Sequence, residues 1–277
     1  MESASRLSPP DQPSSRLAAR NERLSSHGAL SPSGGGGTAL LDVRGVTKRF
    51  GGLVANHDIS FRVAAGELVG IIGPNGAGKS TLFDLLTGFQ TADAGEVMLD
   101  GQAITRLRPD EISRLGVART FQKLKPFTQM TVLENVMVGA FQKTTDPARA
   151  RSEAFEALER VGLADRAQAH AQVLSTGQRK RLELARALAT RPRLLLMDEV
   201  TGGVDLRSIP ALVALVREVN AGGMALVVIE HNMGVIMDIS HRIVALNLGE
   251  VIADGPPAVV GRDPRVVEAY LGQAYVR

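Results

Sequence analysis

Apolar and polar positions follow different periods along the chain, and each change of period marks a different kind of segment. Leu41–Val43 and Ile59–Val63 alternate between apolar and polar residues, as half-buried strands do. Leu68–Ile72 is a continuous apolar run of strand length, which predicts a strand buried on both faces. A glycine-rich turn follows this run directly and leads into a predicted helix at Lys79–Thr87.

The middle of the chain has a helical pattern instead. Between about Pro109 and Thr190 we expect helices and no strand, so a helical subdomain is inserted at roughly residues 109–190. The predicted helices are Asp110–Leu115, Val132–Phe141, Arg151–Val161 and Gly177–Thr190. The second of these follows Thr131, and Glu134 stands three residues later, which is the pattern of a capping box.

Short buried strands return after Pro192 and alternate with helices. The predicted strands are Leu194–Met197, Ala225–Ile229 and Ile243–Asn247, and the helices are Arg207–Asn220 and Asn232–Ile239. Strands that alternate with helices form a mostly parallel sheet. An Asp100-Gly101 turn between residues 96–99 and 102–104 predicts an antiparallel hairpin as well. The expected fold class is therefore α/β.

Residues 1–38 differ from the rest in composition. They are rich in Ser, Pro, Arg and Gly and end in the run Gly34–Gly37. Such a segment has too few large apolar groups to offset the entropy of ordering it, so we expect a disordered tail. A phosphorylated or partner-binding arm is the alternative. Residues 39–277 are expected to form the folded domain.

Composition narrows the classes of partner. The 277 residues are 44% apolar and 22% charged, as in an ordinary globular protein, and the formal net charge of +3 is too small to indicate a nucleic-acid partner. Arg179–Arg181 are consecutive on a predicted helix and point about 100° apart, so they form no single basic patch. The absence of cysteine excludes disulfides and favours the cytoplasm. No apolar run approaches the roughly 20 residues of a membrane span, so work at a membrane would require another protein's helices.

The most specific motif lies between the buried strand and the helix at Lys79. It is the phosphate-binding loop G-x-x-x-x-G-K-S, formed by Gly73, Pro74, Asn75, Gly76, Ala77, Gly78, Lys79 and Ser80 and followed by Thr81. Glycines let the backbone N–H groups surround an anion, and the helix N-terminus adds positive potential there. Lys79 is expected to reach the β- and γ-phosphates of ATP, and the Ser80 hydroxyl to bind Mg²⁺.

A pair of acids ends the predicted strand at residues 194–197. Buried carboxylates without partners are costly, but at the carboxyl end of a strand they can face a cation and a water molecule. Asp198 is expected to bind Mg²⁺, and Glu199 to orient or deprotonate the attacking water. A strand that simply reaches solvent is the alternative, and the phosphate loop favours the functional interpretation.

Leu174-Ser175-Thr176-Gly177-Gln178 opens a helix about twenty residues before this acid pair. In form and position it resembles the L-S-x-G-Q signature of the ATP-binding subunits of ABC transporters. The resemblance implies an ABC-type nucleotide-binding domain of the P-loop NTPase fold, with an antiparallel β-subdomain beside the mostly parallel core. It also implies a dimer, in which Ser175, Gly177 and Gln178 close over ATP held by a second ATP-binding subunit.

Four further positions match the family. Gln122 matches the glutamine that senses Mg²⁺ and water, and His231 matches the histidine that contacts the γ-phosphate. Asp205 matches the aspartate of the loop that crosses the dimer interface, and Phe50 the aromatic residue that stacks on adenine. For Phe50, packing in the core is the alternative.

Within the family, the chain is most similar to the ATPase subunits of branched-chain amino acid importers. The matching segments are residues 50–55, 116–122, 130–136 with 138–139, 229–233 and 269–272. The resemblance implies transmembrane permease partners, a solute-binding protein acting through them, a homo- or heterodimer of ATPase subunits, and a peripheral place at the cytoplasmic face of the cell membrane.

The chain departs from the subgroup pattern at several positions. They are Thr176, Val200, His241 and the segment Gly202–Asp205, none of which removes an expected catalytic group. The competing interpretations are the ATPase of a lipid or lipopolysaccharide exporter, a soluble ABC ATPase of DNA repair or translation, and a regulator that binds ATP without hydrolysing it.

Overall fold

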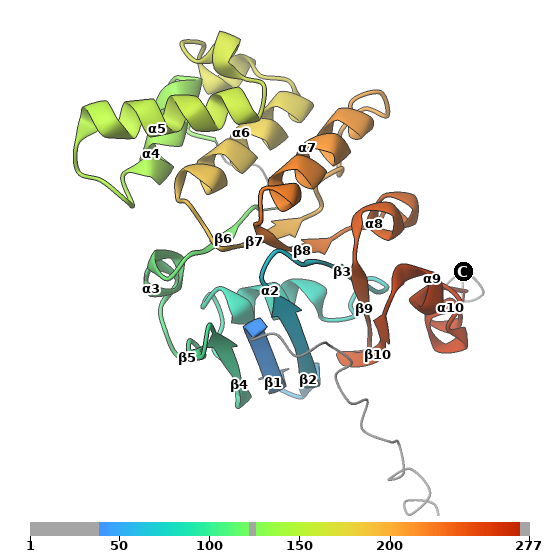
Figure 1. Ribbon diagram of the computed structural model, residues 1–277. Helices are drawn as coiled ribbons and strands as arrows, with labels where there is room; N and C mark the ends of the chain where they lie inside the picture. The colour runs from blue at the N-terminus through green and yellow to red at the C-terminus, as the bar shows by residue number, and fades with distance from the viewer. Residues whose placement is uncertain (1–38, 122–125, 272–277) are drawn as a thin grey trace, which may run out of the picture. The chain divides into compact units, whose positions relative to one another are not determined.

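The computed structural model describes residues 39–121 and 126–271. The expected tail at residues 1–38, Gln122 and residues 272–277 lie outside this part of the chain. Two sheets organise the described residues (Figure 1). The four-stranded sheet has the order β2-β1-β4-β5, and its strands are antiparallel. They are β1 (Ala39–Phe50), β2 (Leu53–Ala64), β4 (Ala94–Leu99) and β5 (Gln102–Ala103).

The six-stranded sheet has the order β10-β9-β3-β8-β7-β6. All neighbouring pairs are parallel except β10 with β9, which confirms the expected mostly parallel core. The strands are β3 (Leu68–Ile72), β6 (Val117–Arg119), β7 (Leu194–Asp198), β8 (Ala225–Ile229), β9 (Arg242–Asn247) and β10 (Glu250–Gly255). Because β6 lies between residues 109 and 190, the expectation of no strand there is wrong.

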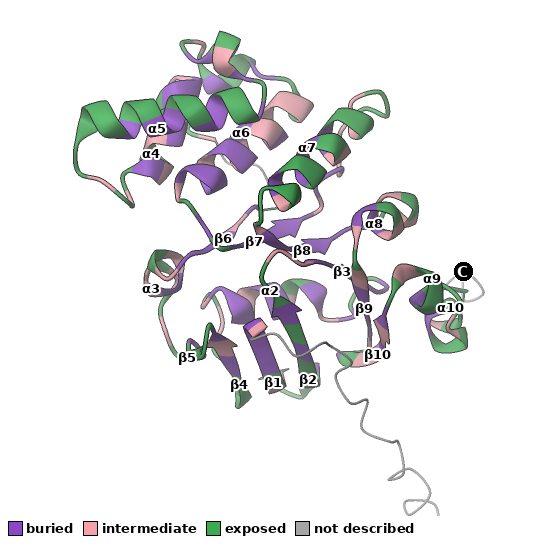
Figure 2. Cartoon of the chain, viewed as in Figure 1, coloured by how far each residue is buried: buried purple, intermediate pink, exposed green. Residues whose placement is uncertain are grey.

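Helices flank both sheets. They are α2 (Lys79–Leu86), α3 (Pro109–Arg114), α4 (Val132–Ala140), α5 (Pro147–Arg160), α6 (Thr176–Ala189), α7 (Ile209–Ala221), α8 (Met233–Ile239), α9 (Pro257–Val260) and α10 (Pro264–Leu271), with 3₁₀ turns at Ala164–Arg166 and Ala171–Val173. Helices α4, α5 and α6 pack on one another, and α5 turns an exposed face outward (Figures 1 and 2). None of the helices in the described part of the chain has the length and hydropathy that a membrane crossing requires.

Two hydrophobic cores meet at the six-stranded sheet. Leu68 and Ile72 of β3 belong to the core shared with α4–α8, whereas Val69 and Ile71 belong to the core shared with α2 and the antiparallel sheet. All five β3 residues are buried, as are β7 and β8 along their lengths (Figure 2). Burial on both faces explains why these strands are continuous apolar runs rather than alternating ones.

The predicted capping box opens α4. The Glu134 N–H donates to the Thr131 hydroxyl at 3.1 Å, and the Thr131 N–H donates to the Glu134 carboxylate at 2.7 Å. These two bonds satisfy donors that a helix N-terminus otherwise leaves without partners. They therefore fix where the helix begins within the three-helix group.

Thr131→Ala is expected to lower the free energy of unfolding by about 1 kcal/mol, because the N–H of Glu134 loses its acceptor. Chemical denaturation followed by circular dichroism measures the change. Thr131→Ser keeps the hydroxyl and serves as the control, with stability close to that of the wild type. Equal losses in both variants would show that the threonine methyl group, not the cap, stabilises this end of α4.

Candidate functional site

The expected site residues follow three neighbouring parallel strands. The phosphate loop follows β3. Asp198 is the last residue of β7, and Glu199 comes directly after it. His231 lies two residues after the end of β8. Because β3 pairs with β8 and β8 pairs with β7, their carboxyl ends lie at the same edge of the sheet. Ligands of open α/β sheets bind at this edge.

The phosphate loop has a backbone that requires glycine. Gly76 and Gly78 have φ angles of 81° and 94°, in the left-handed region. A Cβ atom on Gly78 would lie 2.3 Å from the Ala55 carbonyl oxygen, and one on Gly73 would lie 2.2 Å from that of Leu246. Among the described residues, no side chain caps the N-terminus of α2, which begins at Lys79. Its first N–H groups can therefore bind an anion.

Lys79 is folded into this loop. Its side-chain ammonium donates to the carbonyl oxygens of Gly73 at 2.7 Å and Pro74 at 2.9 Å, and only 6% of the residue is exposed. Burial lowers the pKa of Lys79, and the charges of Asp198 and Glu199 act in the opposite direction. The loop, the lysine and both acids therefore share one electrostatic environment.

Asp198 is buried at the end of β7. Burial raises the pKa of its carboxyl group, and the nearby Arg119 guanidinium, at 3.5 Å from Oδ2, opposes that shift. Arg119 also pairs with Asp84 at 2.5 Å and lies 5.5 and 5.0 Å from the ring centroids of Phe83 and Phe121. The arginine is thus held in place as a counter-charge beside a carboxylate of the kind that binds Mg²⁺.

Glu199 adopts a left-handed backbone with φ of 52°. Its N–H donates to the Ile229 carbonyl at 2.9 Å, and its own carbonyl accepts a bond from the Lys180 ammonium at 2.6 Å. One carboxylate oxygen lies 2.9 Å from Nε2 of His231. Three contacts with distant segments hold this unusual conformation, and they bring together the two side chains expected to act on water and the γ-phosphate.

Glu230 has a position that the sequence analysis did not single out. Its buried carboxylate accepts the N–H groups of Thr201 at 2.6 Å, His231 at 3.1 Å and Asn232 at 3.4 Å. It therefore joins the segment after Glu199 to the segment that carries His231. An acidic residue at the end of the apolar run 225–229 was the available signal, because it is the same signal that identified Asp198.

The signature segment forms a second cluster. Ser175 caps α6, accepting the Gln178 N–H at 3.3 Å, while Gln178 Oε1 accepts the Ser175 N–H at 3.0 Å. A Cβ atom on Gly177 would lie 3.8 Å from Val204, which places the start of α6 beside the Asp205 loop. The Asp205 carboxylate accepts the Ser208 N–H at 3.1 Å and its hydroxyl at 2.7 Å, and these bonds, led by the hydroxyl, lower the pKa of Asp205.

The remaining expected residues have different outcomes. Phe50 is 45% exposed, with the Lys48 ammonium 5.4 Å from its ring centroid, so the core-packing alternative is wrong. Ser80 is exposed and Thr81 half-buried at the start of α2. Val200, one of the departures, is buried in the core shared with α4–α8. The expectation for Gln122 falls outside the described residues.

Comparison with known families agrees with this arrangement. A family described as "ABC transporter" matches residues 56–202, which include the phosphate loop, the signature segment and the acid pair. The chain belongs to the ABC transporter family. A second family, described as "Branched-chain amino acid ATP-binding cassette transporter", matches residues 250–276 of this ABC protein.

Individual relatives cover nearly the whole domain. The high-affinity branched-chain amino acid transport ATP-binding protein LivG of Escherichia coli is 39% identical over 251 residues, covering 85% of this chain and 98% of its own. BraF of Pseudomonas aeruginosa, with the same description, is 39% identical with the same coverage. The probable LivG of Archaeoglobus fulgidus is 35% identical and covers 84% of this chain and 95% of its own.

Solved structures show the same fold. The ADP conformation of MJ1267, an ATP-binding cassette of an ABC transporter, has a TM-score of 0.78 and 34% identity over 85% of this chain and 100% of its own. The dimeric cassette MJ0796 has a TM-score of 0.71 and 29% identity over 78% of this chain and 98% of its own. The protein is an ATP-binding and ATP-hydrolysing subunit of an ABC transporter.

Proposed function

We propose that this ATPase powers the import of branched-chain or related amino acids. The 39% identity with LivG and BraF supports this more than any other observation, and the separate match of residues 250–276 to a branched-chain amino acid family agrees with it. The proposal includes a peripheral location at the cytoplasmic face of the membrane. It also includes the division into a tail at residues 1–38 and a domain at residues 39–277, in which a helical subdomain is inserted at roughly residues 109–190.

Within the site, the loop from Gly73 to Ser80 and Thr81 would hold the phosphates of ATP, with Phe50 stacking on adenine. The exposed ring of Phe50 and the uncapped N-terminus of α2 support these assignments. Lys79 would exchange its two carbonyl acceptors for phosphate oxygens. All of these groups bind and orient the substrate.

Ser80 and Asp198 fit Mg²⁺, with Gln122 as a further oxygen donor. A hydroxyl and one carboxylate suit this ion, which is usually bound by one or two carboxylates together with substrate phosphates. Among the described residues, no group of three or more acids, histidines or cysteines could hold a metal ion. Phosphate oxygens of ATP would be further ligands of Mg²⁺. When bound, Mg²⁺ neutralises charge on the β- and γ-phosphate oxygens.

Glu199 would accept the proton of the attacking water, and His231 would contact the γ-phosphate. Their 2.9 Å separation supports a shared role for the two groups at one reacting centre. Ser175, Gly177 and Gln178 stand at the start of α6, far from the phosphate loop in sequence. We propose that they close over ATP in the partner, with Asp205 crossing the interface; the dimeric MJ0796 cassette supports this.

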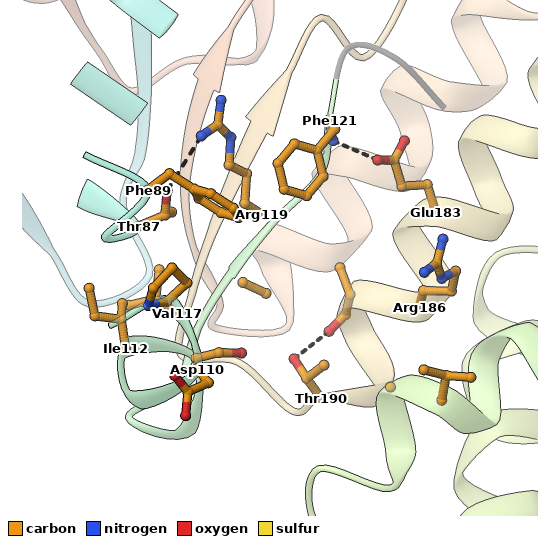
Figure 3. A pocket seen from close by; sticks show the side chains of 16 residues that line it. Thr87, Phe89, Asp110, Ile112, Val117, Arg119, Phe121, Glu183, Arg186 and Thr190 are labelled. Carbon is orange, nitrogen blue, oxygen red and sulfur yellow. Dashed lines mark hydrogen bonds between the residues drawn. The ribbon is translucent and has the colours of Figure 1, made fainter. Parts of the chain in front are cut away.

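The permease would dock in a groove of about 380 Å³ that is shared by the core and the helical subdomain (Figure 3). Phe89 and Phe121 line it with edge-to-face rings whose centroids are 5.8 Å apart, and exposed Val138 of α4 contributes another apolar surface. Glu183 accepts the Phe121 N–H at 2.5 Å, and burial raises the pKa of this carboxyl group. Exposed aromatic side chains around a groove are typical of a protein-binding surface.

Phe89→Glu is expected to abolish co-purification with the permease while leaving ATP affinity unchanged within about twofold, because a buried interface would then contain an unpaired charge. Phe155→Glu is the matched control, since Phe155 is also exposed but lies on α5 outside the groove. Loss of the permease in both variants would argue against the groove as the docking surface.

The overall proposal is tested by affinity purification from detergent-solubilised membranes, followed by uptake of labelled leucine. Multi-spanning permeases and a second ATP-binding chain should co-purify, and cells with Glu199→Gln should lose uptake. Lipid-exporting permeases, or DNA-repair or ribosomal proteins, would favour the competing interpretations instead.

A further inference from the structure

The C-terminal helix contacts the first residue of the phosphate loop. The Tyr270 hydroxyl, on α10, accepts the N–H of Gly73 at 2.7 Å across 197 residues of sequence. Gly73 immediately follows β3 and begins the loop. In the sequence, Tyr270 belongs to a segment that resembles the family but has no expected role in the site.

This hydrogen bond is one of three contacts that hold the backbone of Gly73 in place. On the other side of the residue, the Gly73 carbonyl accepts the Lys79 ammonium at 2.7 Å. The Leu246 carbonyl oxygen of β9 lies so close that a Cβ atom on Gly73 would be 2.2 Å from it. The backbone at Gly73 is thus held through its N–H by Tyr270, through its C=O by Lys79, and sterically by Leu246.

Tyr270 is itself held by packing. It is half-buried, and α10 is anchored by buried Val266. Burial raises the pKa of the Tyr270 hydroxyl, and the hydrogen bond from the Gly73 N–H acts in the opposite direction. The tyrosine and Val267 line a groove of about 780 Å³ together with Met233 and Met237 of α8, the helix that begins just after His231. The C-terminal helix is therefore next to both the loop and the element that follows His231.

We propose that Tyr270 is a positioning residue for ATP binding, and that the C-terminal helix keeps the phosphate loop in its binding conformation through the bond to Gly73. Tyr270 need not touch the nucleotide, because it acts through the orientation of the Gly73 peptide. A loop already in its binding conformation loses less entropy when ATP binds, so the contact contributes to affinity. The inference rests on the proposed role of residues 73–80 in holding the phosphates.

The test is Tyr270→Phe in the full chain, measured by titration with a fluorescent ATP analogue. Loss of one hydrogen bond to a buried N–H should raise Kd about tenfold. In the assembled ATPase, KM for ATP should rise by a similar factor while kcat changes less than about twofold, because the contact orders the loop equally in the ground and transition states. An unchanged Kd and KM would overturn the proposal, even if the melting temperature fell.

Val267→Ala is the matched control, because Val267 lies on the same helix and in the same groove but is exposed and makes no bond to the loop. Its Kd should equal that of the wild type; equal weakening in both variants would show that helix packing is responsible. Amide exchange of the peptide that contains Gly73 should accelerate only in Tyr270→Phe. If Lys79→Ala also left ATP binding intact, the proposed phosphate site would fail, whereas failure of Tyr270→Phe alone removes only this inference.

Discussion

Glu199→Gln is expected to lower ATP turnover by a factor on the order of 10² or more while ATP binding is retained. Glutamine keeps the shape of the side chain. In the wild type, Nε2 of His231 lies 2.9 Å from Oε1 of Glu199, and the glutamine side chain can still form a hydrogen bond there. It cannot accept a proton from water. The variant therefore removes basicity with little change in geometry.

The charges around the site predict that Glu199→Gln does not weaken ATP binding. The negative charge of Glu199 acts on Lys79, and it would also repel the phosphates of ATP. Removing this charge should leave the affinity for ATP equal or slightly higher. The measurement is phosphate release at saturating ATP by the assembled transporter, paired with a titration of ATP binding.

Two variants make the result specific. Glu199→Asp retains a carboxylate that is one methylene shorter and should keep more activity than Glu199→Gln. Glu159→Gln changes an exposed acid on α5 and should behave as the wild type. Wild-type turnover in Glu199→Gln would exclude Glu199 as the base, and His231 would then be the next candidate for that role.

The buried strands were predictable from local pattern alone. Leu68–Ile72 and Ala225–Ile229 have the observed bounds, because a strand buried on both faces is apolar at every position. Val117–Arg119 was missed because three residues are too few to show a period, and the strand exists through its pairing with β7. The edge strand Glu250–Gly255 was also missed; only Ala253 and Gly255 in it are buried, so its sequence carries little apolar signal.

The site could be predicted as a set of motifs but not as a set of contacts. Parallel strand ends place the phosphate loop, Asp198 and His231 at one edge, and this follows from the order of strands and helices. The contacts of Arg119 with Asp198, of Glu230 with Thr201, and of Tyr270 with Gly73 join segments far apart in sequence. Such pairs depend on side-chain packing, which no spacing in a single sequence reveals.

Lys79→Ala is expected to weaken ATP binding about 10- to 100-fold or more, because charge-assisted hydrogen bonds to phosphate are among the stronger polar contacts. The change also leaves the carbonyls of Gly73 and Pro74 without the donor that they have in the wild type. A fluorescent ATP analogue titration measures affinity, and thermal unfolding measured in parallel separates lost binding from lost stability. Lys79→Met fills the buried space without charge, so it should bind ATP as poorly; restored binding would show that volume was the cause.

A double variant tests whether Lys79 promotes ATP binding by neutralising the charges of Asp198 and Glu199. Its ammonium lies in the field of Asp198 and Glu199, and the charges of Arg119 and Lys180 also act on Asp198. Without Lys79, the site loses one positive charge, and the two carboxylates repel the triphosphate with less opposition. Adding Glu199→Gln to Lys79→Ala should therefore recover part of the lost affinity, although turnover stays low. If the double variant binds no better than Lys79→Ala alone, Lys79 binds ATP through direct hydrogen bonds and not by neutralising the two acids.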